Sequence, residues 1–176
     1  DCFNEYSDDI PSIINGYSVT EIGNNAFDYC DSLTEITIPG SVTKIGSNAF
    51  MRCANLTTVI IGDSVTEIER NAFEECTSLS SVTIGNSVSE IGDWAFVNTN
   101  LTEIIIPDSV TSIGVWVFQN CVSLTSITIG DGLLSPLSYS VFNNCPNLTS
   151  ITIGKFIENK NILEFFGNTK IGDWTS

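Results

Sequence analysis

Apolar residues return along the chain at a nearly constant interval, with polar residues and glycine between them. The interval is marked by leucines that are 23, 23, 22, 23 and 24 residues apart, namely Leu33, Leu56, Leu79, Leu101, Leu124 and Leu148. After each leucine the block continues, with local departures, as Leu-x-x-Ile-x-Ile, a turn, Val-x-x-Ile and finally Ala-Phe-x-x-Cys. A fixed period of this length indicates a repeat solenoid, in which each coil buries its apolar side chains against the neighbouring coils.

The coil from 33 to 55 predicts the local structure of the others. Leu33–Ile38 matches the Leu-x-x-Leu-x-Leu pattern of a leucine-rich repeat and alternates as a strand does. Val42 and Ile45 are expected to point inward from a second extended piece, and Ala49–Cys53 to form one turn of helix. The predicted fold is one right-handed leucine-rich-repeat solenoid of about six coils of 22–24 residues, with short parallel strands and short helical or 3-10 turns.

The repeat register holds from 19 to 154 and fails at both ends. Residues 1–18 are predicted to be an N-terminal cap or a partial repeat, and residues 155–176 a C-terminal cap, because an open end exposes core and strand edges. A truncated array with artificial ends fits the same sequence, so both interpretations stay open. The first residues do not resemble a signal peptide, and no run approaches the roughly 18 apolar residues of a membrane helix, so we expect no membrane insertion.

Acidic residues outnumber basic ones by 21 to 6, which gives a formal net charge of −15. Nucleic acid and anionic membranes are therefore not expected partners, since both are bound through clustered Lys and Arg. The acids gather at the start, where residues 1–35 hold eight acids and no base. Two interpretations remain: the charge keeps a strand-rich protein soluble, or it attracts a basic protein ligand.

Five of the six cysteines occupy one position of the repeat, three residues after its phenylalanine: Cys30, Cys53, Cys76, Cys121 and Cys145. Stacked coils place such residues side by side at roughly the 4.8 Å strand spacing, with their side chains parallel. A disulfide instead needs Cβ atoms that face each other. The sequence therefore predicts a buried ladder of reduced thiols. Cys2 lies outside the regular spacing and is interpreted as the same position in an incomplete coil.

The residues needed for common catalytic and metal sites are missing or wrongly spaced. The chain has no histidine, which excludes Ser-His-Asp and Cys-His catalysis and histidine-containing zinc sites. It has no glycine-rich nucleotide-binding motif, and Asp28 and Asp31 lack the spacing of a calcium loop. Gly62–Val65 is one copy of a turn found in other coils and not a catalytic serine motif. We therefore expect no enzyme activity, no cofactor and no metal.

Strand side chains that point away from the core form one candidate protein-binding surface. Their outermost row is polar except at Ile60 and Ile105, which are expected to be exposed, and the neighbouring row carries Glu35 and Glu103. The threonines that fill the same rows also suit strands for purely structural reasons. The sequence leaves the binding and the structural interpretation open.

Trp94 and Trp116 stand where other coils have Asn25, Asn48 or Asn71. Asparagine at this position indicates contact with water, so the two tryptophans of adjacent coils are expected to stack at the surface. Exposed aromatic residues are enriched in binding hot spots. The pair is therefore a second candidate protein-binding site, and packing on a cap or a loop is the alternative.

Three N-glycosylation sequons share another position of the repeat, at Asn55, Asn100 and Asn147. Serine alternates with asparagine there, so turn preference explains these residues without a sugar. As candidate glycosylation sites they matter only in a eukaryotic secretory pathway.

The segments 38–50 and 106–118 read Ile-Pro-Gly-Ser-Val-Thr-Lys-Ile-Gly-Ser-Asn-Ala-Phe and Ile-Pro-Asp-Ser-Val-Thr-Ser-Ile-Gly-Val-Trp-Val-Phe. In these motifs the chain closely resembles the BspA-like, or Treponema-type, leucine-rich repeats. The resemblance implies an extracellular or cell-surface protein that mediates adhesion to host proteins or other cells, and it implies no catalytic residues. The expected function is therefore non-catalytic protein binding, with self-association as a further use of the same surfaces. The alternative is a structural subunit of a larger assembly.

Overall fold

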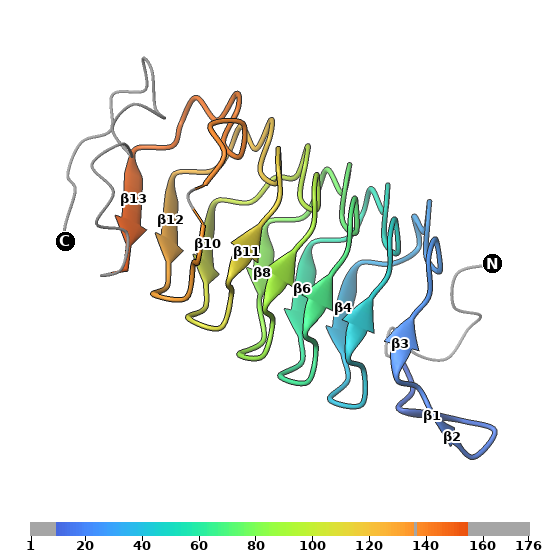
Figure 1. Cartoon of the computed structure of the whole chain (residues 1–176). Coiled ribbons are helices and arrows are strands. Elements are labelled where there is room, and N and C mark those ends of the chain that lie inside the picture. The colour runs from blue at the N-terminus through green and yellow to red at the C-terminus, as the bar shows by residue number, and fades with distance from the viewer. Residues whose placement is uncertain (1–9, 136, 155–176) are drawn as a thin grey trace.

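The computed structural model describes residues 10–135 and 137–154, and in it the chain winds into a row of stacked coils (Figure 1). The coils follow the sequence repeat and have their core between two rows of strands. We number them in chain order as coil 1 (19–32), coil 2 (33–55), coil 3 (56–78), coil 4 (79–100), coil 5 (101–123) and coil 6 (124–147).

In coils 2 to 6 one strand follows the repeat leucine, and a sixth strand begins at Ser150, after coil 6. These strands form the first row. Its members are β4 (Glu35–Ile38), β6 (Thr58–Ile61), β8 (Ser81–Thr83), β10 (Glu103–Ile106), β12 (Ser126–Ile129) and β13 (Ser150–Ile153). Where they pair, the strands are parallel and their equivalent residues lie opposite each other, as Ile36 does to Val59. Alternation buries Ile36 and Ile38 and leaves Thr37 exposed. The predicted solenoid of parallel strands is therefore confirmed.

The second extended piece of each coil forms a separate, continuous sheet of two-residue strands. Its members, in spatial order, are β3 (Glu21–Ile22), β5 (Lys44–Ile45), β7 (Glu67–Ile68), β9 (Glu90–Ile91) and β11 (Ser112–Ile113). A hydroxyl ladder runs beside these strands, because Thr66 Oγ1 donates to the Thr43 carbonyl at 3.1 Å and Thr43 Oγ1 to the Thr20 carbonyl at 3.1 Å. These threonines have a structural role in joining the coils.

The corner that carries Ala-Phe-x-x-Cys is not a helix, so the prediction of a helical turn at Ala49–Cys53 is wrong. The corner of coil 2 contains two residues in the left-handed backbone region, Asn48 at φ 57° and Arg52 at φ 60°. An L-residue pays a steric penalty in that region, so a right-handed helix does not include it. Equivalent pairs, four residues apart, recur in coils 1, 3, 4 and 5, whereas coil 6 has only Asn144 in this region.

Backbone hydrogen bonds explain why the corner prefers this shape. The amides of Ala49 and Cys53 bond three residues back within the coil, at 3.2 and 3.3 Å. The amides of Asn48, Phe50 and Arg52 instead donate to carbonyls of coil 3 at 2.8 to 3.0 Å, so successive amides bond alternately to the next coil and within their own. Half of the corner amides thus join neighbouring coils, which a helical turn would not allow.

The core is a column of phenylalanines, one from each coil, with rings nearly parallel. The ring centroids are 5.0 Å apart for Phe27–Phe50 and 5.2 to 5.8 Å apart along the rest of the column, which continues through Phe73, Phe96, Phe118 and Phe142. The four central rings are fully buried. Because each ring contacts only the coils next to it, the core is continuous but one-dimensional.

A β-hairpin precedes coil 1. Strands β1 (Ile13–Ile14) and β2 (Tyr17–Ser18) pair in antiparallel fashion. They are joined by Asn15-Gly16, both at positive φ (53° and 82°), as a type I′ turn requires. Residues 1–9 and 155–176 lie outside the described structure, so the assignment of caps at 1–18 and 155–176 stays a prediction.

The first row of strands is interrupted once in the described part of the chain. It consists of two three-stranded sheets, β4-β6-β8 and β10-β12-β13, with no ladder between β8 and β10. Coil 4 is one residue shorter than its neighbours between Phe96 and Leu101, the segment that leads into β10. The missing residue therefore shifts β10 out of hydrogen-bonding position on this side, while the second sheet continues from β9 to β11.

The interruption predicts unequal amide protection in otherwise equivalent strands. Amides of β10 that point towards β8 should exchange with solvent at least about tenfold faster than the matching amides of β12, which are bonded to β10. Hydrogen exchange followed by NMR measures this difference. Inserting one serine between Asn100 and Leu101 restores the 23-residue spacing and should remove the difference; equal rates in the unmodified protein would contradict the prediction.

Candidate binding surfaces

The strand face carries the exposed residues predicted from the sequence. Ile60 is 45 % and Ile105 is 68 % exposed, and Glu35 and Glu103 are exposed as well. The structure does not bring the two isoleucines together, because β8 and the interrupted ladder separate β6 from β10. The expected exposure is confirmed, but these side chains form no continuous apolar patch.

The first threonine row of this face supports the structural interpretation. Thr57 Oγ1 donates to the carbonyl of Thr34, and Thr125 Oγ1 donates to that of Thr102, both at 2.9 Å. These hydroxyls are used to join the coils and are not free to recognise a ligand. The strand face is therefore the weaker candidate surface.

The two tryptophans stack as predicted, and a cation extends the stack. The ring centroids of Trp94 and Trp116 are 5.3 Å apart with planes inclined by 9°. The guanidinium carbon of Arg70 lies 4.3 Å from the Trp94 ring centroid, which is cation–π geometry. Arg70 is exposed and both tryptophans are half-buried. We call these three residues the tryptophan column.

Each tryptophan of the column occupies the first left-handed corner position of its coil, with φ 57° for Trp94 and 55° for Trp116. Earlier coils fill this position with asparagine, which tolerates that conformation best after glycine. The asparagines also bond to one another, since Asn48 Nδ2 donates to Asn25 Oδ1 at 3.0 Å. In the described structure the series ends at Asn71, whose buried Oδ1 has no hydrogen-bond partner beside Trp94.

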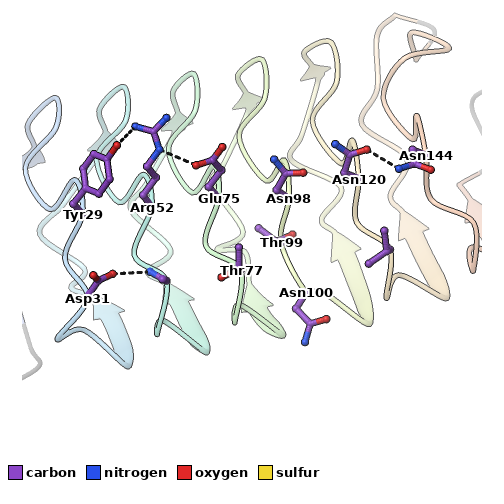
Figure 2. A pocket seen from close by; sticks show the side chains of 12 residues that line it. Tyr29, Asp31, Arg52, Glu75, Thr77, Asn98, Thr99, Asn100, Asn120 and Asn144 are labelled. Atoms are coloured by element: carbon purple, nitrogen blue, oxygen red, sulfur yellow. Dashed lines mark hydrogen bonds and ion pairs between the residues drawn. The ribbon is translucent and has the colours of Figure 1, made fainter.

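A groove runs along the neighbouring flank, beside the second left-handed corner position (Figure 2). It has a volume of about 830 Å³ and extends over all six coils. One side is formed by the corner residues themselves, Tyr29, Arg52, Glu75, Asn98, Asn120 and Asn144. The other side is formed by residues that follow them in each coil, Asp31, Ala54, Thr77, Thr99, Asn100 and Val122.

The N-terminal end of the groove is charged but internally compensated. Arg52 Nε donates to Glu75 Oε2 at 2.7 Å, and Arg52 Nη1 donates to the Tyr29 hydroxyl. The guanidinium carbon also lies 4.9 Å from the centroid of the Tyr29 ring. The hydrogen bond with Glu75 raises the pKa of Arg52. The three side chains form a chain of contacts across coils 1, 2 and 3, as Figure 2 shows.

Amide side chains dominate the other end. Asn144 Nδ2 donates to Asn120 Oδ1 at 2.8 Å. Asn98 stands between this pair and Glu75 in the row, and within the described structure its carboxamide makes no hydrogen bond (Figure 2). This groove was not predicted from the sequence. Its signal was the asparagine that recurs two residues after the phenylalanine in coils 4, 5 and 6.

The cysteine ladder lies inside the coils, away from both flanks. Cys53, Cys76, Cys121 and Cys145 are buried and free, as predicted. Each thiol donates to the carbonyl of the phenylalanine in a preceding coil, at 3.0 to 3.2 Å. Burial raises the pKa of the Cys121 thiol to about 11 and that of Cys145 to about 12. A hydrogen bond with Cys53, together with burial, raises the pKa of Cys76. These raised pKa values keep the three thiols protonated near neutral pH.

Cys30 corrects the prediction of a fully reduced ladder, because it is disulfide-bonded. It occupies the ladder position and is fully buried, but its bonded partner lies outside the described residues. Coil 4 has Thr99 at this position, 3 % exposed, with Oγ1 donating to the Phe96 carbonyl at 2.9 Å and 3.2 Å from Cys121 Sγ. The threonine hydroxyl thus replaces the thiol without leaving a buried polar atom unpaired.

The three sequon asparagines lie at exposed turns between the cysteine ladder and the next strand. Asn55 Nδ2 donates to the Asp31 carbonyl at 2.9 Å, and Asn147 Nδ2 donates to the Val122 carbonyl at 2.7 Å. Both bonds join neighbouring coils, in agreement with a role in the turn. Glycosylation of Asn55, Asn100 and Asn147 stays a prediction.

Within 10–135 and 137–154, no three Cys, Asp or Glu side chains gather closely enough to hold a metal ion. The same part of the chain includes no helix with the length and apolar character needed to cross a membrane.

Comparison with known proteins agrees with this geometry. Stacked parallel strands, buried columns of leucine, isoleucine and phenylalanine, and a cysteine ladder define a β-solenoid of the leucine-rich-repeat class. The model of the BspA type leucine rich repeat region matches six copies, over residues 1–122 and 95–175. The chain therefore belongs to the BspA-type leucine-rich-repeat family. None of the curated proteins matches it.

Solved structures show the same fold. A leucine-rich repeat protein from Bacteroides ovatus ATCC 8483 is 35 % identical, with a TM-score of 0.76 over 85 % of this chain. The T. pallidum leucine rich repeat protein TpLRR is 30 % identical, with a TM-score of 0.81 over 94 % of this chain and 77 % of its own. The pneumococcal vaccine antigen PcpA is 26 % identical, with a TM-score of 0.66 over 70 % of this chain and 31 % of its own. This chain spans 41 % of the length of the Bacteroides ovatus protein.

Proposed function

We propose that this chain is a non-catalytic protein-binding module of a secreted or cell-surface protein, and that it serves adhesion through the tryptophan column. Its membership in the BspA-type family and its similarity to a bacterial vaccine antigen support this setting. The buried thiols with raised pKa values are poor nucleophiles, in agreement with a role other than catalysis. The acidic chain favours a protein ligand with a basic contact surface.

One observation carries the proposal: the column is unfavourable for stability at three points. A left-handed conformation costs roughly 1–2 kcal/mol for a bulky residue such as Trp94 or Trp116, and the unpaired Asn71 Oδ1 costs about 1–3 kcal/mol. Asparagine at both positions would relieve the backbone cost and would place a carboxamide beside Asn71, as Asn48 lies beside Asn25. Backbone strain that is kept at a position where asparagine would be more stable indicates that the residue serves a function there.

The test replaces the column by the asparagine ladder of the earlier coils. The double variant Trp94→Asn and Trp116→Asn should weaken binding to immobilised extracellular-matrix proteins by about 30-fold or more, since a central tryptophan contributes roughly 2 kcal/mol or more to an interface. Biolayer interferometry with laminin and collagen, at low and at high salt, measures this change. The free energy of unfolding should stay within about 2 kcal/mol, because lost stacking is offset by relief of backbone strain.

Control variants on the strand face make the result specific. Ile60→Thr and Ile105→Thr introduce the residue already present in equivalent positions and should leave binding unchanged. Unchanged binding by the tryptophan double variant, or a melting temperature lowered by tens of degrees, would show that the column is structural. An association that is stoichiometric and insensitive to salt would favour the role of an assembly subunit instead of adhesion.

A further inference from the structure

The middle of the groove gathers polar groups whose hydrogen-bonding capacity is unused. The Asn98 carboxamide and the exposed Thr77 hydroxyl have no partner among the described residues. Asn100 accepts a hydrogen bond from Ser123 at Oδ1 and keeps its Nδ2 free. Asn120 uses its Oδ1 towards Asn144 and likewise keeps Nδ2 free. Donors and an acceptor from coils 3, 4 and 5 therefore line the same groove, with Asn98 and Asn120 along its upper row in Figure 2 and Asn100 at its lower edge.

The charge of the groove is low despite the acidity of the chain. Arg52 is paired with Glu75 at 2.7 Å, and the other charged residue of the lining, Asp31, belongs to coil 1 at the end of the groove. An anionic or cationic ligand would find no unpaired opposite charge at the centre. The free amides and the hydroxyl there are neutral, so the complementary ligand is neutral and rich in hydroxyl or amide groups.

The main chain beside the groove is closed to ligands. The amides of Glu75, Asn98 and Asn120 donate to carbonyls of the next coil at 2.9, 3.0 and 2.9 Å. No row of free backbone donors is therefore offered, and addition of a peptide strand, which depends on main-chain bonds, is excluded at these positions. Recognition must come from the side chains.

The spacing of the side chains separates the two remaining kinds of linear ligand. Adjacent coils are 5.0 to 5.8 Å apart, measured between the stacked phenylalanine rings. An extended peptide repeats its side-chain and backbone pattern about every 6.7 Å, so it falls out of step with the coils. A linear chain of pyranose rings advances by about one coil per ring, so each coil meets one ring, with alternate rings turned over in a β-1,4-linked chain. Amides bind such vicinal hydroxyls well, because they donate and accept together.

We propose that this groove is a binding site for a neutral, unbranched oligosaccharide, with the sugar rings laid across successive coils. Asn98, Asn100, Asn120 and Thr77 contact hydroxyl groups at the centre. The exposed ring of Tyr29, held in place by Arg52, covers the apolar face of a sugar at the N-terminal end. The site is separate from the tryptophan column, so the protein has two recognition surfaces, one for protein and one for glycan.

The experiment uses isothermal titration calorimetry with cellohexaose, chitohexaose, mannohexaose and maltohexaose as neutral probes and hexagalacturonic acid as the anionic comparison. At least one neutral probe should bind, and Asn98→Gly should weaken it about tenfold or more through loss of the central amide. Glycine accepts the positive φ of 57° at this position, so the backbone is preserved. Thr77→Val should also weaken binding, because it removes the hydroxyl at nearly constant volume.

Matched variants distinguish this site from the rest of the surface. Asn86→Ala removes an exposed amide of coil 4 from a turn that does not line the groove, and it should leave affinity unchanged. The double variant Trp94→Asn and Trp116→Asn should also bind the sugar normally, even if protein adhesion is lost. The proposal is overturned if no neutral probe binds at millimolar concentration, if hexagalacturonic acid binds as tightly, or if Asn98→Gly binds as the unmodified chain does.

Discussion

Replacing Phe96 with alanine should lower the free energy of unfolding by about 3–5 kcal/mol, as expected for removal of a fully buried aromatic side chain. Phe96 is 0 % exposed, and its ring stacks between Phe73 at 5.3 Å and Phe118 at 5.7 Å. The coils on both sides lose a contact at once, and in a solenoid no distant element can fill the cavity. Chemical denaturation followed by circular dichroism measures the change.

Trp94→Ala is the matched control, because it removes a still larger aromatic side chain two residues earlier in the same coil. That side chain is only half-buried, so its removal should cost less than half as much as the loss of Phe96. Equal costs at the two positions would mean that the tryptophan column belongs to the core. A cost below about 1.5 kcal/mol for Phe96→Ala would mean that the phenylalanine column collapses locally and is not a rigid stack.

The sequence predicts the columns of this solenoid because each column is a repeated residue. Burial of Leu33, Ile36 and Ile45 follows from period and alternation alone. The shape of the corner does not follow, since Ala49–Cys53 has apolar residues at helical spacing. The shape of the corner is decided by hydrogen bonds from alternate amides to the next coil. These bonds join residues more than 20 positions apart, so a local sequence pattern does not reveal them.

In the candidate sites, too, the repeat predicts some features and not those that depend on contacts between coils. The stacking of Trp94 on Trp116 was predictable, because both stand at one repeat position in adjacent coils. Arg70 was not, because it precedes that position by one residue and reaches the column across a coil boundary. The disulfide of Cys30 also escaped prediction, because the parallel side chains of the repeat led us to expect reduced thiols at every ladder position.

The left-handed corners connect the fold to both proposed sites. Coils 1 to 5 each offer two such positions and coil 6 offers one, at Asn144, and their side chains are directed to the flanks instead of into the core. The first position carries asparagine until Trp94 and Trp116 replace it, and the second forms the row from Tyr29 to Asn144 that lines the groove. Because the inter-coil amide bonds hold the corner backbone, side chains at these positions vary without loss of the repeat. Both proposed sites thus lie where the solenoid tolerates change.

The second large effect is expected at alkaline pH, where the protein should lose stability through its buried thiols. The pKa of Cys121 is raised from 9.0 to about 11 and that of Cys145 to about 12, in both cases mainly by burial. A raised native pKa means that the folded state favours the protonated thiol. The resulting stabilisation is complete below about pH 9 and is lost as the pH rises through 11 and 12.

Between about pH 8 and 10.5 the two thiols together should remove about 4 kcal/mol of the free energy of unfolding, by proton linkage between the native pKa values and the ordinary thiol pKa of 9.0. Denaturation curves at several pH values measure this slope. The double variant Cys121→Ala and Cys145→Ala should be somewhat less stable at neutral pH and should have a clearly flatter slope above about pH 9. The other ionisable groups of the chain are common to both proteins, so their contributions cancel in the comparison. Parallel slopes would show that the thiols reach solvent and that the ladder is not sealed between the coils.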